Sequence, residues 1–178
     1  RVVTDVEPAK VLQSLASSLD ARLIRRGVED IPYLWRAYVG ERKDVKGVGA
    51  FLHKFVSSDD WNFHSHPWEF AVSFILDGEY EEMKIEGCAL DRNGGRDVVF
   101  DSSTGRVVRH RAGDKNIIYD RTFHRVDLIS KEVWSLFVHG PRVGGWGFVE
   151  PVAANRFPAC GVPLPIRAMT GHTRDRLP

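Results

Sequence analysis

A series of short apolar segments separated by turn-forming residues dominates the middle of this chain. Each segment is four to eight residues long, and the stretches between them, such as residues 102–105, are rich in Gly, Asp, Asn and Ser, which favour turns. The segments lie at residues 33–39, 49–56, 70–76, 80–85, 98–101, 107–110, 116–119, 123–129 and 133–139. Antiparallel chains of this kind usually close, because closure removes exposed strand edges. We therefore predict an all-β fold, a barrel or jelly roll, over about residues 33–150.

The two ends of the chain differ from this pattern. In residues 8–26 the apolar side chains recur at steps of three and four, which predicts one amphipathic helix that ends before Gly27. Residues 151–178 are rich in Pro and Gly without apolar periodicity, and we expect an irregular tail that wraps the barrel or a neighbouring subunit. Since 178 residues is the usual length of one domain, we expect a single domain over residues 1–178.

Composition argues against several classes of partner. Lys and Arg number 25 against 24 Asp and Glu, so the net charge of +1 provides no broad basic surface for nucleic acid or an anionic bilayer. The longest strongly apolar run, residues 70–76, is far shorter than the roughly 20 residues of a membrane-spanning helix. Two cysteines, Cys88 and Cys160, are too few for a disulfide framework. We expect a soluble, cytoplasmic protein with no nucleic-acid or membrane partner.

Three of the seven histidines are spaced as metal ligands. His64 and His66 are separated by one residue, and residues i and i+2 of a strand point to the same face, so both imidazoles can reach one ion. His124 follows a polar turn and opens an apolar strand, which can deliver a third imidazole. We interpret His64, His66 and His124 as ligands of one divalent transition metal. The alternative is a set of hydrogen-bonded or solvent-exposed histidines.

The residues around these histidines resemble the two signature segments of the cupin superfamily. The first segment has the form HxH, three or four residues, Glu, six residues and Gly; here it begins at His64 and ends at Gly78. The second has the form Gly, five residues, Pro-x-Gly, two residues, His, three residues and Asn, and Gly113 and His124 match its spacing. The places of its Pro, second Gly and Asn are held here by Tyr119, Arg121 and Leu128.

The resemblance covers roughly residues 51–138. It implies a small single-domain β-barrel, metal ligands on facing strands, a small-molecule substrate and a homodimer. Residues 60–70 are also similar to a branch of small cupins with a His-Pro-Trp segment, which implies the fold and no particular reaction.

The carboxylate of the first cupin segment is displaced in this chain. Counted back from Gly78, the family spacing places it at Ala71, whereas Glu69 lies two residues earlier. Either a bulge brings Glu69 to the metal, or the ligands are three histidines alone. We favour three histidines, which resembles the thiol dioxygenases among the cupins and leaves coordination positions open. Glu69 would then orient a ligand histidine or move a proton.

Tyr119 and Arg121 join Glu69 as candidate catalytic residues because they lie just before His124. The Arg121 guanidinium can hold a substrate carboxylate in a bidentate fork. It can equally pair on the surface with Asp120 or Asp127.

The other histidines and the aromatic residues have structural interpretations. His53 shares a strand face with two phenylalanines and is expected in the core, whereas His110 and His139 are expected at the surface. Large aromatics usually serve as core, although they can also line a cavity for a planar ligand. This applies to Trp61, Trp68, Trp134 and Trp146.

These features favour a mononuclear non-haem iron oxygenase, with Fe(II) held by the three histidines and a small molecule as substrate. A second hypothesis keeps the site but loads Zn, Ni or Mn as a Lewis acid for an isomerase or lyase. A third is a cupin that holds a metal or ligand without turnover. A metal-free sugar epimerase would instead use His64 or His66 with Tyr119 as base and acid.

Overall fold

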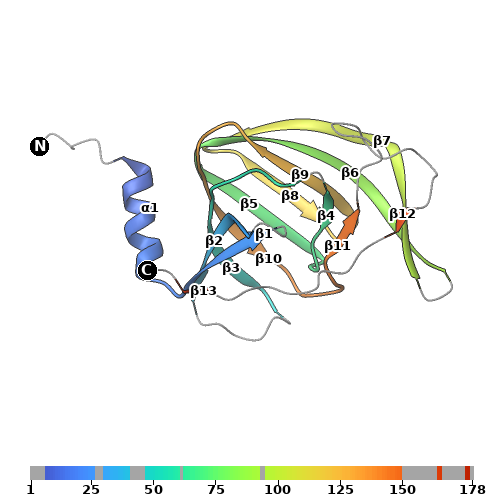
Figure 1. Ribbon diagram of the computed structural model, residues 1–178, viewed down its shortest axis with the longest axis horizontal. Coiled ribbons are helices and arrows are strands. Elements are labelled where there is room, and N and C mark those ends of the chain that lie inside the picture. The colour runs from blue at the N-terminus through green and yellow to red at the C-terminus, as the bar shows by residue number, and fades with distance from the viewer. Residues whose placement is uncertain are drawn as a thin grey trace, which may run out of the picture.

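The computed structural model describes residues 7–26, 30–40, 47–60, 62–92, 95–149, 164–165 and 175–176. Within these ranges the chain forms one helix and a series of strands (Figure 1). They are α1 (Pro8–Ser17), β1 (Ala21–Arg26), β2 (Ile31–Val39), β3 (Gly49–Phe55), β4 (Phe63–Ser65), β5 (Phe70–Asp77), β6 (Glu79–Arg92), β7 (Gly95–Arg111), β8 (Lys115–Tyr119), β9 (Thr122–Leu128), β10 (Val133–His139), β11 (Gly147–Val149), β12 (Leu164–Pro165) and β13 (Asp175–Arg176).

The strands form two antiparallel sheets that curl around a common interior (Figure 1). The first, sheet A, has the strand order β13-β1-β2-β3-β10-β5-β8. The second, sheet B, has the order β11-β4-β9-β6-β7-β12. The long strands β6 and β7 pair with each other in sheet B. The prediction of an all-β fold with one N-terminal helix is confirmed.

Alternation along the strands decides which side chains face the interior. In β5, Ala71, Ser73 and Ile75 are buried while Phe70 and Phe74 are exposed, as the two-residue period of a strand requires. Two apolar clusters fill parts of the interior, one around Phe51, Trp68 and Phe137 and one around Ile75, Tyr80 and Val126. The space between the sheets is therefore only partly apolar, and polar side chains occupy the rest.

The helix is shorter than the sequence predicted. It ends at Ser17, and residues 21–26 form β1 instead of the last turns of a helix over 8–26. Leu23 fits both patterns, because it lies four residues after Leu19 and two residues after Ala21. Pairing with β2 supplies the backbone hydrogen bonds of this segment and buries Ala21 and Leu23 on one face. Gly27, the predicted helix end, lies outside the described residues.

One predicted turn is also wrong. The segments 98–101 and 107–110 belong to one strand, β7, and the intervening residues 102–105 do not reverse the chain. The Thr104 side chain instead lies at a local irregularity of the pairing. The Glu86 amide donates to the Thr104 hydroxyl (2.9 Å), and the register of β6 against β7 shifts between Lys84 and Glu86. Turn-forming residues are thus accommodated at a bulge within a paired strand.

Other boundaries agree closely with the predictions. The last predicted strand is β10, which has the predicted bounds, and the predicted Asp77-Gly78 turn joins β5 to β6. Gly78 has a φ of +80°, a left-handed conformation that glycine adopts readily. Most of the predicted tail, residues 151–178, lies outside the described residues; its described pieces, β12 and β13, pair with β7 and β1. No helix within the described ranges has the length and apolar character needed to cross a bilayer.

Candidate metal centre

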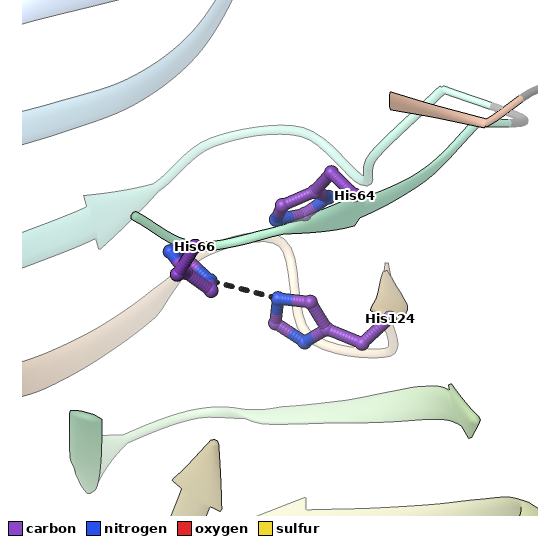
Figure 2. Close-up of side chains that lie close together, drawn as sticks. All are labelled: His64, His66 and His124. Carbon is purple, nitrogen blue, oxygen red and sulfur yellow. Dashed lines mark hydrogen bonds between the residues drawn. The ribbon is translucent and has the colours of Figure 1, made fainter. Parts of the chain in front are cut away.

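The structure brings the three predicted histidines together in the interior. His64 lies in β4, His66 follows directly after β4, and His124 lies opposite His64 in the register of β9 (Figure 2). One ring nitrogen from each lies within 4.8 Å of the others. His66 Nε2 and His124 Nε2 are 2.9 Å apart. Strand alternation aims His64 and His66 to the same side, and pairing with β9 adds the third imidazole.

Aromatic rings surround two of these imidazoles. The His66 ring lies 4.8 Å from the Trp146 ring and 5.5 Å from the Phe137 ring, and the His64 ring stacks with Phe148. Burial lowers the pKa of both His64 and His66 well below the ordinary value, and the neighbouring His124 lowers it further. Both imidazoles are therefore neutral at pH 7, which is the form that binds a metal ion.

Glu82 fixes the orientation of His124. Its Oε1 lies 2.5 Å from His124 Nδ1, so Nδ1 carries the proton and Nε2 presents its lone pair to the other two histidines. If His66 also presents a lone pair at Nε2, two lone pairs face each other across 2.9 Å. A cation between them removes this repulsion, since two ligand atoms about 2.1 Å from one ion and at right angles are about 3 Å apart. The donor set thus fits a divalent transition metal.

A second carboxyl group, that of Asp59, faces Nδ1 of His64, as the Glu82 carboxylate faces Nδ1 of His124. An oxygen of its carboxylate lies 3.7 Å from His64 Nδ1, accepts the Val126 amide at 2.7 Å, and the other oxygen accepts the Tyr33 hydroxyl. Burial raises the pKa of the Asp59 carboxyl to about 6, although the hydrogen bond from Tyr33 and the neighbouring His124 act to lower it. Two of the three histidines therefore have a buried carboxyl group on the side away from the cluster.

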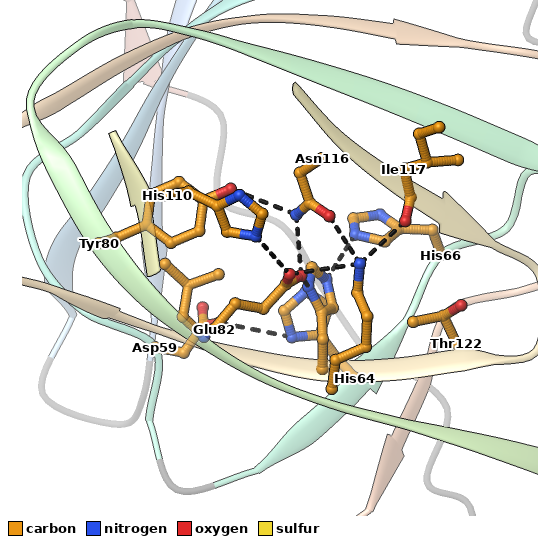
Figure 3. A network of polar contacts seen from close by, with 12 residues as sticks. Asp59, His64, His66, Tyr80, Glu82, His110, Asn116, Ile117 and Thr122 are labelled. Atoms are coloured by element: carbon orange, nitrogen blue, oxygen red, sulfur yellow. Dashed lines mark hydrogen bonds and ion pairs between the residues drawn. The ribbon is translucent and has the colours of Figure 1, made fainter. Parts of the chain in front are cut away.

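Glu82 also anchors a buried polar network (Figure 3). It is 0% exposed, and its two oxygens contact Asn116 Nδ2 (2.9 Å), His110 Nε2 (3.1 Å) and Lys84 Nζ (3.3 Å) besides His124. Lys84 Nζ in turn donates to Asn116 Oδ1 at 2.6 Å and to the Ile117 carbonyl at 2.8 Å. We call Glu82, Lys84, His110, Asn116 and His124 the Glu82 network.

Hydrogen bonding keeps this carboxylate ionised. Burial by itself raises the pKa of Glu82, but the hydrogen bonds from His110 and His124 outweigh burial and hold the pKa well below its ordinary value. A buried anion thus lies directly behind one of the three candidate ligands, where it stabilises positive charge in the site.

Sequence reasoning missed the Glu82 network. The prediction that His110 is at the surface is wrong, because β7 turns this residue inward against Glu82; His139, also expected at the surface, is buried against Trp68. The available signal was the alternation in β6, where Tyr80, Glu82 and Lys84 share one face. Alternating polar residues normally indicate a strand face that contacts solvent. Polar residues on the inner face of a barrel are therefore easily mistaken for residues on its outer face.

The structure does not bring the three candidate catalytic residues to the histidines. Glu69 is exposed where β5 begins, and its backbone amide donates to the Pro141 carbonyl. Tyr119 is 54% exposed on the outer face of sheet A, in register with Phe70. Arg121 is exposed in the turn before β9. Alternation in β5 points Ala71 inward next to Glu69, and the carboxylate that orients a histidine is Glu82 rather than Glu69.

The remaining predicted residues divide between interior and exterior. His53 is buried and stacks on Phe51, as expected of a core histidine. Trp68 and Trp146 lie beside His66, whereas Trp134 packs with Ala16 and Leu52 in the cluster under α1. Asp127, one proposed surface partner of Arg121, instead accepts from Arg125 at 2.7 Å. Trp61 lies outside the described residues.

Comparison with known proteins gives only distant likenesses. No protein-family model and no curated protein matches this sequence. Among solved structures, the DMSP lyase DddQ from Ruegeria pomeroyi is 16% identical with a TM-score of 0.49, and the match covers 77% of this chain and 65% of that chain. A predicted oxalate decarboxylase from Thermotoga maritima is 17% identical with a TM-score of 0.48, covering 71% and 96%. Hydroxypropylphosphonic acid epoxidase from S. wedmorenis is 11% identical with a TM-score of 0.45, covering 66% and 55%.

Likeness at this level assigns no activity to this chain. What the structure itself provides is a pair of curled antiparallel sheets with histidines converging from β4 and β9. This is the arrangement that the cupin resemblance implies, and the chain has a cupin-like fold.

Proposed function

We propose that this protein is a metal-dependent enzyme that binds one divalent transition metal through His64, His66 and His124 and acts as a non-haem iron oxygenase on a small molecule. The observation that carries the proposal is the convergence of three ring nitrogens within 4.8 Å, with the His124 tautomer fixed by Glu82. Three neutral imidazoles leave the full charge of the ion in the site.

The chain's own residues have distinct tasks in this proposal. Glu82 holds the proton of His124 on Nδ1, and Asp59 lies behind His64 at 3.7 Å. Trp146 and Phe137 flank His66 and exclude water from one side of it. Iron(II) held by imidazoles supplies redox chemistry with O₂ and coordination positions for a substrate.

The donor set does not select iron by itself. Imidazole also suits zinc and nickel, and affinity order does not decide which metal is loaded in a cell. With Zn, Ni or Mn the same site would act as a Lewis acid in an isomerase or lyase, and a saturated coordination shell would make it a binding protein.

The test is the metal content of protein purified anaerobically, compared among wild type, His124→Ala and His139→Gln. His139→Gln is the matched control, because it removes a buried imidazole that stacks on Trp68 and is not one of the three clustered histidines. We expect about one equivalent of metal in wild type and control and none above background in His124→Ala. Oxygen uptake after reconstitution with Fe(II) and candidate substrates then separates the oxygenase from the Lewis-acid enzyme.

Two outcomes would overturn the proposal. If wild type binds no metal, the ligand assignment fails. If it binds metal but His124→Ala binds it equally well, the metal lies elsewhere in the chain.

A further inference from the structure

Arg36 brings an unpaired positive charge to the inner face of sheet A. It is half-buried in β2, its Nε donates to His53 Nε2 at 3.1 Å, and its guanidinium lies 4.7 Å from the centre of the Phe51 ring. No carboxylate pairs with it within the part of the chain that the structure describes. Other interior charges behave differently, since Lys84 and Glu82 contact each other.

Two buried polar side chains, His53 and Ser135, follow Arg36 in a row across neighbouring strands. The strand register places Arg36 opposite His53 in β3, and His53 opposite Ser135 in β10, so the three share one face of the sheet. Ser135 is 0% exposed and His53 is 3% exposed. Ser135 Oγ and His53 Nδ1 are buried without a hydrogen-bond partner. We call Arg36, His53 and Ser135 the Arg36 row.

The free groups of this row can all donate hydrogen bonds. Because His53 Nε2 accepts from Arg36, its proton lies on Nδ1, the atom that has no partner. Burial and the charge of Arg36 lower the pKa of His53, which keeps the ring neutral. The Trp68 Nε1–H, nearby in the same cluster as Phe51, is also buried without an acceptor. Within the described residues, this half-buried cation and the unpaired donors around it therefore have no anion.

The Arg36 row lies next to the candidate metal centre. A single aromatic ring separates them: Phe137 stacks on His53 at 5.1 Å and lies 5.5 Å from the His66 ring. The row and the candidate metal centre therefore lie on either side of one aromatic side chain, Phe137.

We propose that the Arg36 row binds a carboxylate group of the substrate, with the Arg36 guanidinium and the Ser135 hydroxyl as its main donors. This names the substrate class, small carboxylic acids, and it rests on the proposed function for the role of the neighbouring metal. A carboxylate fits because its planar pair of oxygens matches the guanidinium fork and because one cation balances one negative charge.

The test compares propionate with propionamide, a neutral molecule of the same shape. Binding of each is followed by ligand-observed NMR on metal-free protein at constant ionic strength. Since a charge-assisted hydrogen bond is replaced by a neutral one, we expect propionate to bind about tenfold or more tightly than propionamide to wild type. Arg36→Gln should abolish this preference, whereas Arg109→Gln, which removes an exposed arginine paired with Glu79, should retain it.

Two further variants keep the test decisive if Arg36→Gln does not fold. Arg36→Lys retains the charge but loses the planar fork, and Ser135→Ala removes one donor. Each should weaken propionate binding several-fold, by roughly the loss of one charge-assisted hydrogen bond, and should weaken propionamide binding less. Equal binding of the two molecules to wild type would overturn the proposal, as would an unchanged preference in Arg36→Gln. Because the protein is metal-free, failure of the metal proposal does not alter this result, and the metal content is measured separately.

Discussion

The Glu82 network and the Arg36 row are both polar groups inside the same barrel, but they differ in how their hydrogen bonds are satisfied. Both oxygens of Glu82 have donors, and Lys84 Nζ contacts three oxygens. In the Arg36 row, Ser135 Oγ and His53 Nδ1 have no partner. A satisfied network belongs to the folded chain itself, whereas unsatisfied donors are costly to bury without a ligand. The first region is suited to hold ligands of a metal in place, and the second to receive a substrate.

The largest effect should come from breaking the Glu82 network. Replacing Glu82 with Leu leaves the buried Lys84 ammonium and the His110 and His124 donors without their anion. We expect the free energy of unfolding to fall by about 3–5 kcal/mol, the cost of an uncompensated buried charge. Urea denaturation measures this. If Glu82→Leu is as stable as wild type, the network does not support the fold.

A smaller effect is expected from the isosteric change Glu82→Gln. The amide keeps the shape but gives His124 a neutral, weaker acceptor, so the His124 tautomer is less firmly fixed. Metal affinity should fall about 10–100-fold, as for other residues that hold a metal-ligating histidine. Competition with a chromophoric chelator gives the affinity, and Glu79→Gln at the exposed Arg109 pair serves as the control. An affinity equal to wild type would leave Glu82 without a role in orienting His124.

The third prediction concerns His53 of the Arg36 row and the way the free energy of unfolding depends on pH. Burial and the Arg36 charge lower the pKa of His53, so the unfolded chain takes up this proton at a higher pH than the folded chain does. The free energy of unfolding therefore falls as the pH drops below about 6.5, by at most about 1.4 kcal/mol per pH unit from this residue. His53→Gln should make that decline shallower.

Asp59 acts in the opposite direction. Its raised pKa of about 6 means that the folded chain keeps a proton which the unfolded chain has lost, so its contribution to stability declines as the pH rises from about 4 to about 6. The free energy of unfolding is measured against pH for wild type and for His53→Gln. The difference between the two curves does not contain the contribution of Asp59, because both proteins have this residue. Parallel curves for the two proteins between about pH 5 and about pH 7 would show that His53 is not held neutral by the fold.

The smallest effect on stability should follow from Arg36→Met. The change loses the hydrogen bond to His53 but also removes an unpaired cation that burial disfavours, since burial lowers the pKa of Arg36. We expect the free energy of unfolding to change by less than about 1 kcal/mol in either direction. Urea denaturation beside Glu82→Leu gives the comparison. A loss as large as that of Glu82→Leu would make Arg36 a structural residue.

The sequence predicted the parts of this molecule that depend on spacing along one strand. His64 and His66 share a face because equivalent positions in a strand recur every two residues. The third histidine was indicated by a polar turn before an apolar strand and by the resemblance to the second cupin segment. Which residues lie opposite each other across strands is not encoded in spacing. Glu82 meets His124, and His53 meets both Arg36 and Ser135, only through sheet register.

One misplaced element and one missed polar network both depend on how the strands pair and close. Leu19 and Leu23 satisfy a helical period and a strand period at once, and only pairing with β2 decides between them for residues 21–26. Likewise, Glu82 and Lys84 look like a solvated strand face until the sheet is closed around them. Alternation usually places the apolar residues of a strand inside and the polar residues outside. Polar residues inside a barrel break this rule, and local sequence does not show which face of the strand is enclosed.

The shortness of β4 has a consequence for how the histidine cluster comes into being. This strand is three residues long, it carries His64 and directs His66, and it meets β9 at a position 60 residues further along the chain. No segment of local sequence can form the cluster, so it exists only once the two ends of the barrel have closed. A strand with so few backbone hydrogen bonds is also an early place for the native chain to open. An ion bound by histidines of β4 and β9 would therefore hold these two strands together. Binding of the metal should then slow amide hydrogen exchange in this part of sheet B.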